Sequence, residues 1–189
     1  MSTFADLKIE GKWKEEETID SSNFLKAIGV SKTKRSLSKK IKTKLKYMGN
    51  PSNPLAFSNA SQSGPIKLGP HSHVIGQPRI DDKPGPFGKT EVSSEIVSSS
   101  ENNDDVLTLL TTITIKELNK SSDAENLKIG DQMVSKIFKD GEKLRSVTAF
   151  VPKDLNGKSR DDWLKETEMT KIFKYKGEAK NMEIEEEDD

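Results

Sequence analysis

The chain has 189 residues, 31% apolar and 33% charged, and its 31 Lys and Arg balance its 31 Asp and Glu. This length predicts one domain with additions or two small domains, and the low apolar content predicts that part of the chain lies outside any core. The absence of cysteine excludes disulfides, thiolate metal sites and a cysteine nucleophile. No stretch approaches the roughly 20 apolar residues of a membrane-spanning helix, and the N-terminus lacks a signal-peptide pattern. We therefore expect a soluble intracellular protein.

A strand and a short helix are predicted first. Apolar residues or glycine fall on alternate positions from Leu7 to Trp13, a period of two that is typical of a half-buried strand. Asp20 and Ser21 can then cap a short helix with Phe24 on its apolar face. Gly29 is suited to end this helix.

A second helix is predicted over residues 31–48. Leu37, Ile41, Leu45 and Met48 recur at helical spacing, and Gly49 supplies a stop. The rest of its surface is basic, with no interrupting acid: Lys32, Lys34, Arg35, Lys39, Lys40, Lys42, Lys44 and Lys46.

Residues 49–89 differ in composition from the rest. All but one of the prolines lie here, mixed with glycine and serine. Proline removes a backbone donor, and glycine is entropically costly to fix. We interpret this stretch as a flexible Pro/Gly/Ser-rich insertion.

Strand patterns resume at Thr90. They run over residues 91–98, 106–115, 127–138, 144–151 and 169–176, with turn signals at 102–105, 140–141 and 156–157. The order of one strand, two short helices and further antiparallel strands predicts an up-and-down β-barrel whose mouth carries a helix-turn-helix lid. The predicted organisation is a strand and lid (1–48), the insertion (49–89), the remaining strands (90–177) and a solvated acidic tail (178–189).

Two regions of the chain carry motifs that occur in the same order in one known family. Gly11-Lys12-Trp13 and the segment from Asn23 to Val30 resemble the opening strand and helix of the intracellular fatty-acid-binding proteins, which belong to the lipocalin-like calycins. The interval from Trp13 to Gly29 and Val30 matches that family without a gap. The segments 105–109, 114–116, 127–130 and 143–148 are similar to its later meander strands. Together these matches cover about half of the chain and each alone is moderately specific. The insertion has no counterpart, and the end looks about one hairpin short of ten strands.

The resemblance implies a cavity that holds a fatty acid. Family members bind the carboxylate through arginine and tyrosine, because a buried carboxylate is costly without a cation and donors. When residues 170–173 are aligned with the family's last strand, Lys171 takes the place of the arginine and Phe173 that of the tyrosine, and Tyr175 lies on the same face. When residues 166–177 are aligned instead with an earlier strand of the family, Lys171 again takes an arginine position. An exposed strand lysine is the alternative of equal weight.

Further residues are expected to line this cavity. Arg145 is a second candidate cation, although the direction of its side chain stays open. Ile115 takes a position where the family has a mouth-guarding phenylalanine, and ordinary core packing is the alternative for the apolar candidates Phe24, Leu25, Ile115 and Met133.

The basic helix predicts contact with an anionic membrane. Cations opposite an apolar stripe are typical of a helix that lies on such a surface, and the candidate contacts are Lys34, Arg35, Lys39, Lys42 and Lys46. The acidic tail is hypothesised to compete for these lysines. The alternative function is a non-enzymatic protein that uses residues 31–48 to bind nucleic acid or a protein partner, but few aromatic residues accompany the lysines.

Other chemistry has weak support in the sequence. His71 and His73 have a spacing that can present two imidazoles to a metal, yet no third ligand is near them. No nucleophile triad, P-loop or dinucleotide motif is present. We expect no enzyme activity, cofactor or metal. The predicted protein is a monomeric lipid carrier of the cytoplasm, with the nucleus as a second location and without nucleic-acid binding.

Overall fold

A computed structural model describes residues 2–85, 87–101, 104–120 and 122–183. A 3₁₀ turn, Phe4–Leu7, precedes strand β1, Gly11–Ile19. Helices α1, Ser21–Ala27, and α2, Lys32–Ser38, follow. The remaining elements are β2 (Thr43–Asn50), β3 (Asn53–Ser63), β4 (Ile66–Val74), β5 (Arg79–Gly85), β6 (Gly88–Glu101), β7 (Asp104–Glu117), β8 (Gln132–Asp140), β9 (Lys143–Val151), α3 (Arg160–Glu166) and β10 (Met169–Gly177).

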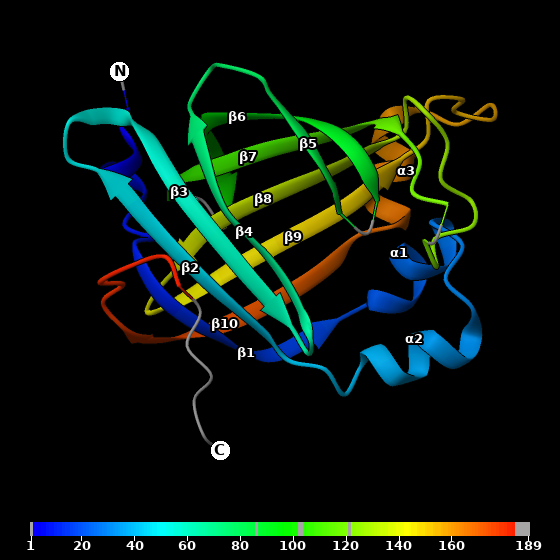
Figure 1. Ribbon diagram of the computed structural model, residues 1–189, viewed down its shortest axis with the longest axis horizontal. Helices are drawn as coiled ribbons and strands as arrows, with labels where there is room; N and C mark the ends of the chain where they lie inside the picture. The colour runs from blue at the N-terminus through cyan, green and yellow to red at the C-terminus, as the bar shows by residue number, and fades with distance from the viewer. Residues whose placement is uncertain (1, 86, 102–103, 121, 184–189) are drawn as a thin grey trace.

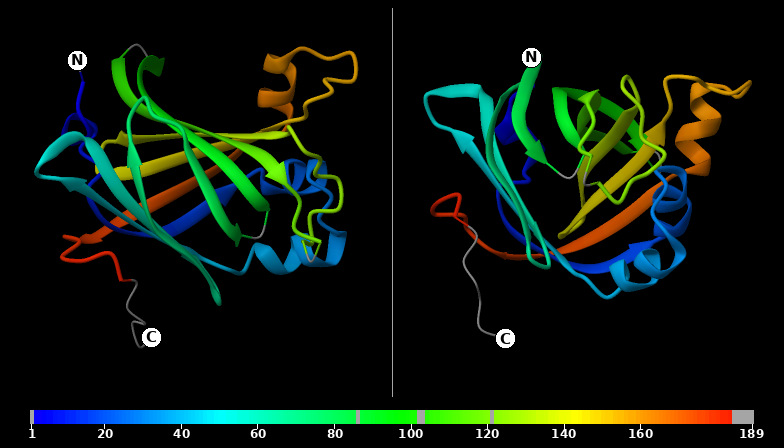
Figure 2. Two further views of the ribbon diagram at one scale, coloured as in Figure 1. Left: turned by 45° about the horizontal axis from the view of Figure 1, so that its top comes forward. Right: turned by 45° about the vertical axis from the view of Figure 1, so that its right-hand side comes forward.

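The ten strands form one antiparallel sheet in the order β4-β3-β2-β1-β10-β9-β8-β7-β6-β5. The sheet curls into a nearly closed barrel, with the first and last strands of the chain paired in its middle (Figures 1 and 2). Strands β4 and β5 are its two edges. The predicted antiparallel barrel is confirmed, and the expected shortage of one hairpin is wrong.

Two apolar clusters fill opposite ends of the barrel. The cluster beside the 3₁₀ turn contains Phe4, Trp13 and Phe173, and the cluster beneath α1 contains Phe24 and Ile115. The three α-helices gather at this second end (Figure 1). Within the described residues, no helix has the length and apolarity needed to span a bilayer.

The predicted first strand and helix are present with shifted limits. Leu7 lies in the 3₁₀ turn, and β1 begins only at Gly11. Helix α1 begins at Ser21, but the Asp20 side chain makes no capping hydrogen bond. Gly29 follows the helix at φ 92°, where an added Cβ would lie 2.4 Å from the backbone nitrogen of Asn126. A glycine is therefore required at this turn.

The predicted helix over residues 31–48 is wrong beyond Ser38. The chain from Thr43 to Asn50 is strand β2, because Thr43 and Tyr47 alternate with outward lysines and are buried. Leu37, on the supposed helical stripe, is instead 57% exposed. A period of two that buries one face against the core has overridden the helical spacing.

The predicted flexible insertion is also wrong. Residues 49–89 form the end of β2, all of β3, β4 and β5, and the start of β6. Pro70 lies in β4 and Pro84 in β5, the two edge strands, where a missing backbone donor breaks no ladder on the open side. Pro51 and Pro65 occupy turns. These strands complete the ten-stranded sheet, for which the sequence predicted one hairpin too few.

The C-terminal half follows the predicted strands with one addition. The Asp140-Gly141 turn joins β8 to β9 as expected, and the strand expected over 127–138 begins at Gln132. Asn156-Gly157 is not a hairpin and instead precedes α3, which Ser159 caps through its side chain. Asn102 and Asn103, in a predicted turn, lie outside the described residues, as do residues 184–189 of the predicted tail.

Candidate functional site

A cavity of about 220 Å³ lies inside the barrel between the edge strands and their neighbours. Alternate residues of β3 to β7 line it, because successive strand side chains point to opposite faces of the sheet. The lining consists of Asn59, Ser61, Leu68, His71, His73, Arg79, Asp81, Phe87, Gly88, Thr90, Val92, Thr111 and Ile113. The cavity therefore borders the seam where β4 and β5 do not pair in the sheet.

One side of this cavity is cationic. An Nη of Arg79 lies 3.5 Å from the Asp81 carboxylate, and Nδ1 of His71 lies 3.5 Å from the same oxygen. The Nε of Arg79 is buried and has no hydrogen-bond partner among the described residues. A guanidinium with an unused buried N–H can donate a hydrogen bond to an anion that binds inside the cavity.

His73 borders the same polar group. Its ring stacks on Phe57 at 4.8 Å, and its Nε2 lies 3.0 Å from Oδ1 of Asn59. Burial, with Arg79 and His71 nearby, lowers the pKa of His73 to about 4. His73 is therefore neutral at pH 7, and Arg79 is the permanent positive charge of the cavity.

The opposite side is apolar and continuous with the core beneath α1. Phe87 and Ile113 line the cavity and also pack against that cluster. Leu68 and Val92 complete the apolar wall. A small molecule with one anionic end and one hydrocarbon end fits this division.

No protein-family model matches the chain, and no curated protein matches its sequence. Solved structures do. The REP1-NXSQ fatty acid transporter is 13% identical with a TM-score of 0.56, over 89% of this chain and 96% of the other. Lipid binding protein 8 of Caenorhabditis elegans is 12% identical with a TM-score of 0.58, over 93% and 99%. As-p18, an extracellular fatty acid binding protein, is 15% identical with a TM-score of 0.57, over 89% and 96%.

This chain has the fold of the fatty-acid-binding proteins. At these identities the likeness carries the fold and leaves the ligand to be argued from the residues. The predicted calycin resemblance is confirmed at that level. These three neighbours are named for lipid binding or transport, which is the function class that the sequence predicts.

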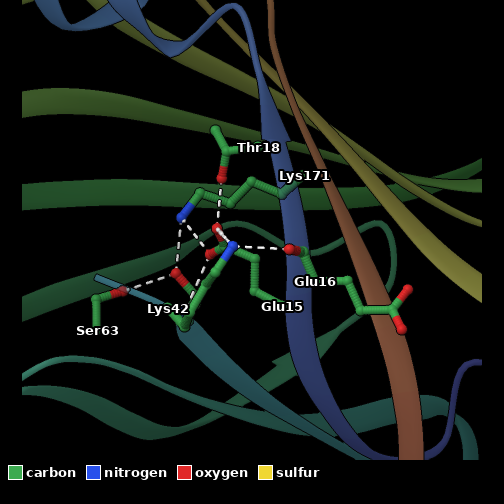
Figure 3. Close-up of polar contacts among 7 residues, drawn as sticks. Glu15, Glu16, Thr18, Lys42, Ser63 and Lys171 are labelled. Carbon is green, nitrogen blue, oxygen red and sulfur yellow. Dashed lines mark hydrogen bonds and ion pairs between the residues drawn. The ribbon is translucent and has the colours of Figure 1, made fainter. Parts of the chain in front are cut away.

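Lys171 lies inside the barrel but is already engaged. Its Nζ donates to Oε2 of Glu15 at 2.9 Å, as Figure 3 shows. The same Nζ donates to Oγ1 of Thr43 at 2.7 Å. The Glu15 side chain is 2% exposed and that of Lys171 is 22% exposed. Lys171 does not line the cavity beside Arg79.

The carboxylate of Glu15 is fully supplied with donors. The Thr18 hydroxyl donates to it, and the backbone N–H of Thr43 donates to it at 2.9 Å. Nζ of Lys42 lies 3.9 Å from the same carboxylate. Burial alone raises the pKa of Glu15, but hydrogen bonds from Thr18 and Lys171 outweigh it and leave the pKa lowered. Glu15 therefore stays charged and balances Lys171.

The other predicted head-group residues lie apart from one another. Phe173 is buried in the cluster beside the 3₁₀ turn. Tyr175 is 43% exposed, with its ring 5.2 Å from that of Trp13. Arg145 neighbours the buried Leu144, so it points outward, where it pairs with Asp140 at 2.6 Å.

The predicted apolar residues are brought together. Phe24, Ile115 and Met133 are buried in the cluster beneath α1, and Leu25 packs against it. Because this cluster adjoins Phe87 and Ile113, these four residues lie behind the apolar wall of the cavity. Ordinary core packing and ligand lining both remain compatible with this position.

The predicted membrane-contact residues are not on one helix. On α2, Lys34 pairs with Asp123 and Arg35 donates to the Val30 carbonyl at 2.6 Å. Lys39 follows the helix and is exposed. Nζ of Lys42 lies 2.7 Å from the carbonyl of Glu16, and Lys46 is on β2.

The sequence reasoning missed Arg79. It lies in the stretch interpreted as flexible, and so does the His71–His73 pair. The available signal was the spacing of two in both His71-Ser72-His73 and Arg79-Ile80-Asp81, which places each pair on one face of a strand. Among the described residues, no group of three or more His, Asp or Glu is suited to bind a metal.

Proposed function

We propose that this protein binds and carries a fatty acid or similar hydrophobic carboxylate inside its barrel, with Arg79 as the anchor for the carboxylate. The observation that supports this most is the buried, unused Nε of Arg79 in a cavity whose far wall is apolar. A carboxylate there would receive a charge-assisted hydrogen bond, and its chain would gain about 0.8 kcal/mol per buried CH₂.

Arg79 takes the role that the sequence assigned to Lys171. A ligand carboxylate at Lys171 would have to compete with Glu15, which is buried and well supplied with donors. A carboxylate at Arg79 faces weaker competition, because the Asp81 oxygen is 3.5 Å away and is shared with His71.

The cavity size limits the ligand. Its volume of about 220 Å³ lies below the roughly 300 Å³ at which pockets for drug-sized ligands begin. Short or branched hydrophobic acids fit it as it is. Longer chains require the half-buried Phe87 to move, which would open the space toward Ile115 and Met133.

A displacement assay tests the proposal. A fluorescent fatty acid bound to the protein is displaced by carboxylic acids of increasing length and by the matching alcohols. Arg79→Gln should weaken the acids by about tenfold or more, because a charged hydrogen bond contributes roughly 1.5–3 kcal/mol, and should leave the alcohols unchanged. Arg145→Gln, which removes an outward arginine, is the matched control and should change neither. Absence of saturable displacement from folded protein, or equal loss for acids and alcohols, would reject the proposal.

Helix α2 is proposed to deliver the ligand at an anionic membrane. Leu37 and Ile41 are 57% and 40% exposed and stand beside the cations of α2 and the following turn, including Lys39. Exposed apolar side chains next to lysines are typical of surface-bound helices. Binding to phosphatidylserine vesicles should fall several-fold in Leu37→Glu and with added salt, and unchanged binding would remove α2 from this role.

The proposed carrier acts as a monomer in the cytoplasm or nucleus and performs no chemistry on its ligand. The alternative, a basic helix of residues 31–48 that binds nucleic acid or a protein, loses its main support because that helix ends at Ser38. Release of the ligand unchanged, checked by mass spectrometry after incubation, distinguishes a carrier from an enzyme.

A further inference from the structure

Four lysines form a continuous row on the outside of the barrel. Lys44 of β2 lies directly opposite Lys14 of β1, Lys14 opposite Lys174 of β10, and Lys174 opposite Lys143 of β9. Lys12 and Lys46 form a second pair one pleat along. Their strand neighbours Trp13, Phe173 and Leu144 are buried inside, so these lysines point outward. We call the six residues Lys12, Lys14, Lys44, Lys46, Lys143 and Lys174 the lysine wall.

This row of like charges lowers the stability of the fold unless negative charges lie close to it. Like charges directly opposite each other on antiparallel strands are destabilising. Glu16 pairs with Lys143, and that contact, together with the charges of Lys174 and Lys176, lowers the pKa of Glu16. Within the described residues, no carboxylate forms an ion pair with Lys12, Lys14, Lys44 or Lys174.

The chain itself returns to this face after β10. In Figure 1 the segment after β10 (red) turns back beside β1 and β2. Nζ of Lys46 donates to the backbone carbonyl of Glu183, and Lys46 is only 6% exposed although it points away from the core. Glu183, the last described residue, therefore lies against the lysine wall.

The residues that follow have the complementary charge. Positions 184–189 read Ile-Glu-Glu-Glu-Asp-Asp, and Glu183 precedes them. Six extended residues reach about 20 Å. Four neighbouring strands, at about 4.8 Å spacing, span about 14 Å. The acidic segment is long enough to cross the whole row from its anchor at Lys46.

We propose that the lysine wall is the docking surface for this chain's own acidic segment, residues 183–189. The attachment at Glu183 keeps the carboxylates at high effective concentration, so individually weak surface pairs add into a network. The segment neutralises the like-charge row and shields it from other polyanions. The lysine wall lies on the outer face of β1, β2, β9 and β10 and is separate from the ligand cavity.

Lysine reactivity tests the proposal. Three proteins are compared: the full chain, a chain ending at Glu183, and a full-length variant with Glu185, Glu186 and Glu187 changed to Gln and Asp188 and Asp189 to Asn. Each is acetylated at low ionic strength and analysed by mass spectrometry. Lys14, Lys44 and Lys174 should react several-fold more slowly in the full chain than in the other two. Lys128, between β7 and β8, and Lys165, on α3, are exposed and lie outside the strands that carry the wall, so they should react equally in all three.

Salt and a free peptide separate the possible occupants. At about 1 M salt, where the screening length is about 3 Å, the protection should disappear. A peptide of residues 183–189 added to the shortened chain should restore it. Equal reactivity in all three proteins would overturn the proposal. So would protection that survives in the amide variant, since charge would then not be its cause, or protection that grows with protein concentration, since a second copy would then be the occupant.

Discussion

Lys171 and Arg79, two cations of the barrel interior, have opposite surroundings. Lys171 faces a buried carboxylate and a hydroxyl at hydrogen-bond distance, both supplied by strands β1 and β2. Arg79 faces the seam between β4 and β5, with one carboxylate at 3.5 Å and a buried nitrogen that has no partner among the described residues. Lys171 therefore has its hydrogen-bond partners within the protein, whereas Arg79 keeps one buried donor without a partner among the described residues.

This difference indicates which cation maintains the fold and which is available to a ligand. Removing one partner of a buried ion pair lowers the unfolding free energy strongly, because the other charge stays buried without a counter-charge. An incomplete site lowers stability slightly in the empty protein and recovers that loss when an anion binds.

Removal of the Lys171 charge should have the largest effect. Lys171→Met leaves the buried Glu15 with only the more distant Nζ of Lys42, at 3.9 Å, near its carboxylate. We expect a loss of about 3 kcal/mol in unfolding free energy, near the lower end for broken buried pairs because Lys171 is partly exposed. Urea denaturation measures it. Adding Glu15→Gln should recover part of the loss, whereas Lys143→Met, a surface control, should cost no more than about 1 kcal/mol. A loss for Lys171→Met as small as that of the control would contradict the structural role.

Lowering the pH should also reduce the unfolding free energy, through protonation of His73. Its pKa is lowered to about 4 in the folded protein from an ordinary value of 6.5. Between these values the unfolded chain binds a proton that the folded chain does not, so stability falls as the pH drops from about 6.5 to about 4, by about 3 kcal/mol in total. Urea titrations at several pH values measure the slope. His73→Gln should remove this part of it, and a bound carboxylate should reduce it by stabilising the protonated ring. A slope that is unchanged in His73→Gln would assign it to other groups.

The fold was predictable where one periodicity had no rival. Trp13 on a half-buried strand, Gly29 after a short helix and the Asp140-Gly141 turn each carry a local signal that packing supports. At residues 43–48 two periods competed, since Leu45 fits both a helical stripe and an alternating strand. Burial of Thr43 and Tyr47 decided for the strand, and that decision depends on partners distant in sequence.

The cavity was less predictable than the barrel. Proline content suggested flexibility for residues 49–89, but prolines are tolerated in the edge strands of a sheet, and edge status is a property of the whole topology. Arg79 lies on one of these edges, so its position next to the cavity depends on the same topology. Helix α3 was also missed because its seven residues show little periodicity, although the Ser159 and Asp162 capping pair marks its start.

The smallest expected change in stability belongs to Arg79. Arg79→Gln should lower the unfolding free energy by no more than about 1 kcal/mol, because the ion pair with Asp81 is long and His71 remains beside that carboxylate. The same substitution should raise the pKa of His73, since the positive charge of Arg79 helps to lower it; an NMR titration of the histidine ring protons measures this shift. A stability loss that equals that of Lys171→Met would mean that both cations maintain the fold, and the division between a structural and a ligand-binding cation would be wrong. A small loss combined with weaker binding of carboxylates would instead assign the charge at the β4–β5 seam to the ligand.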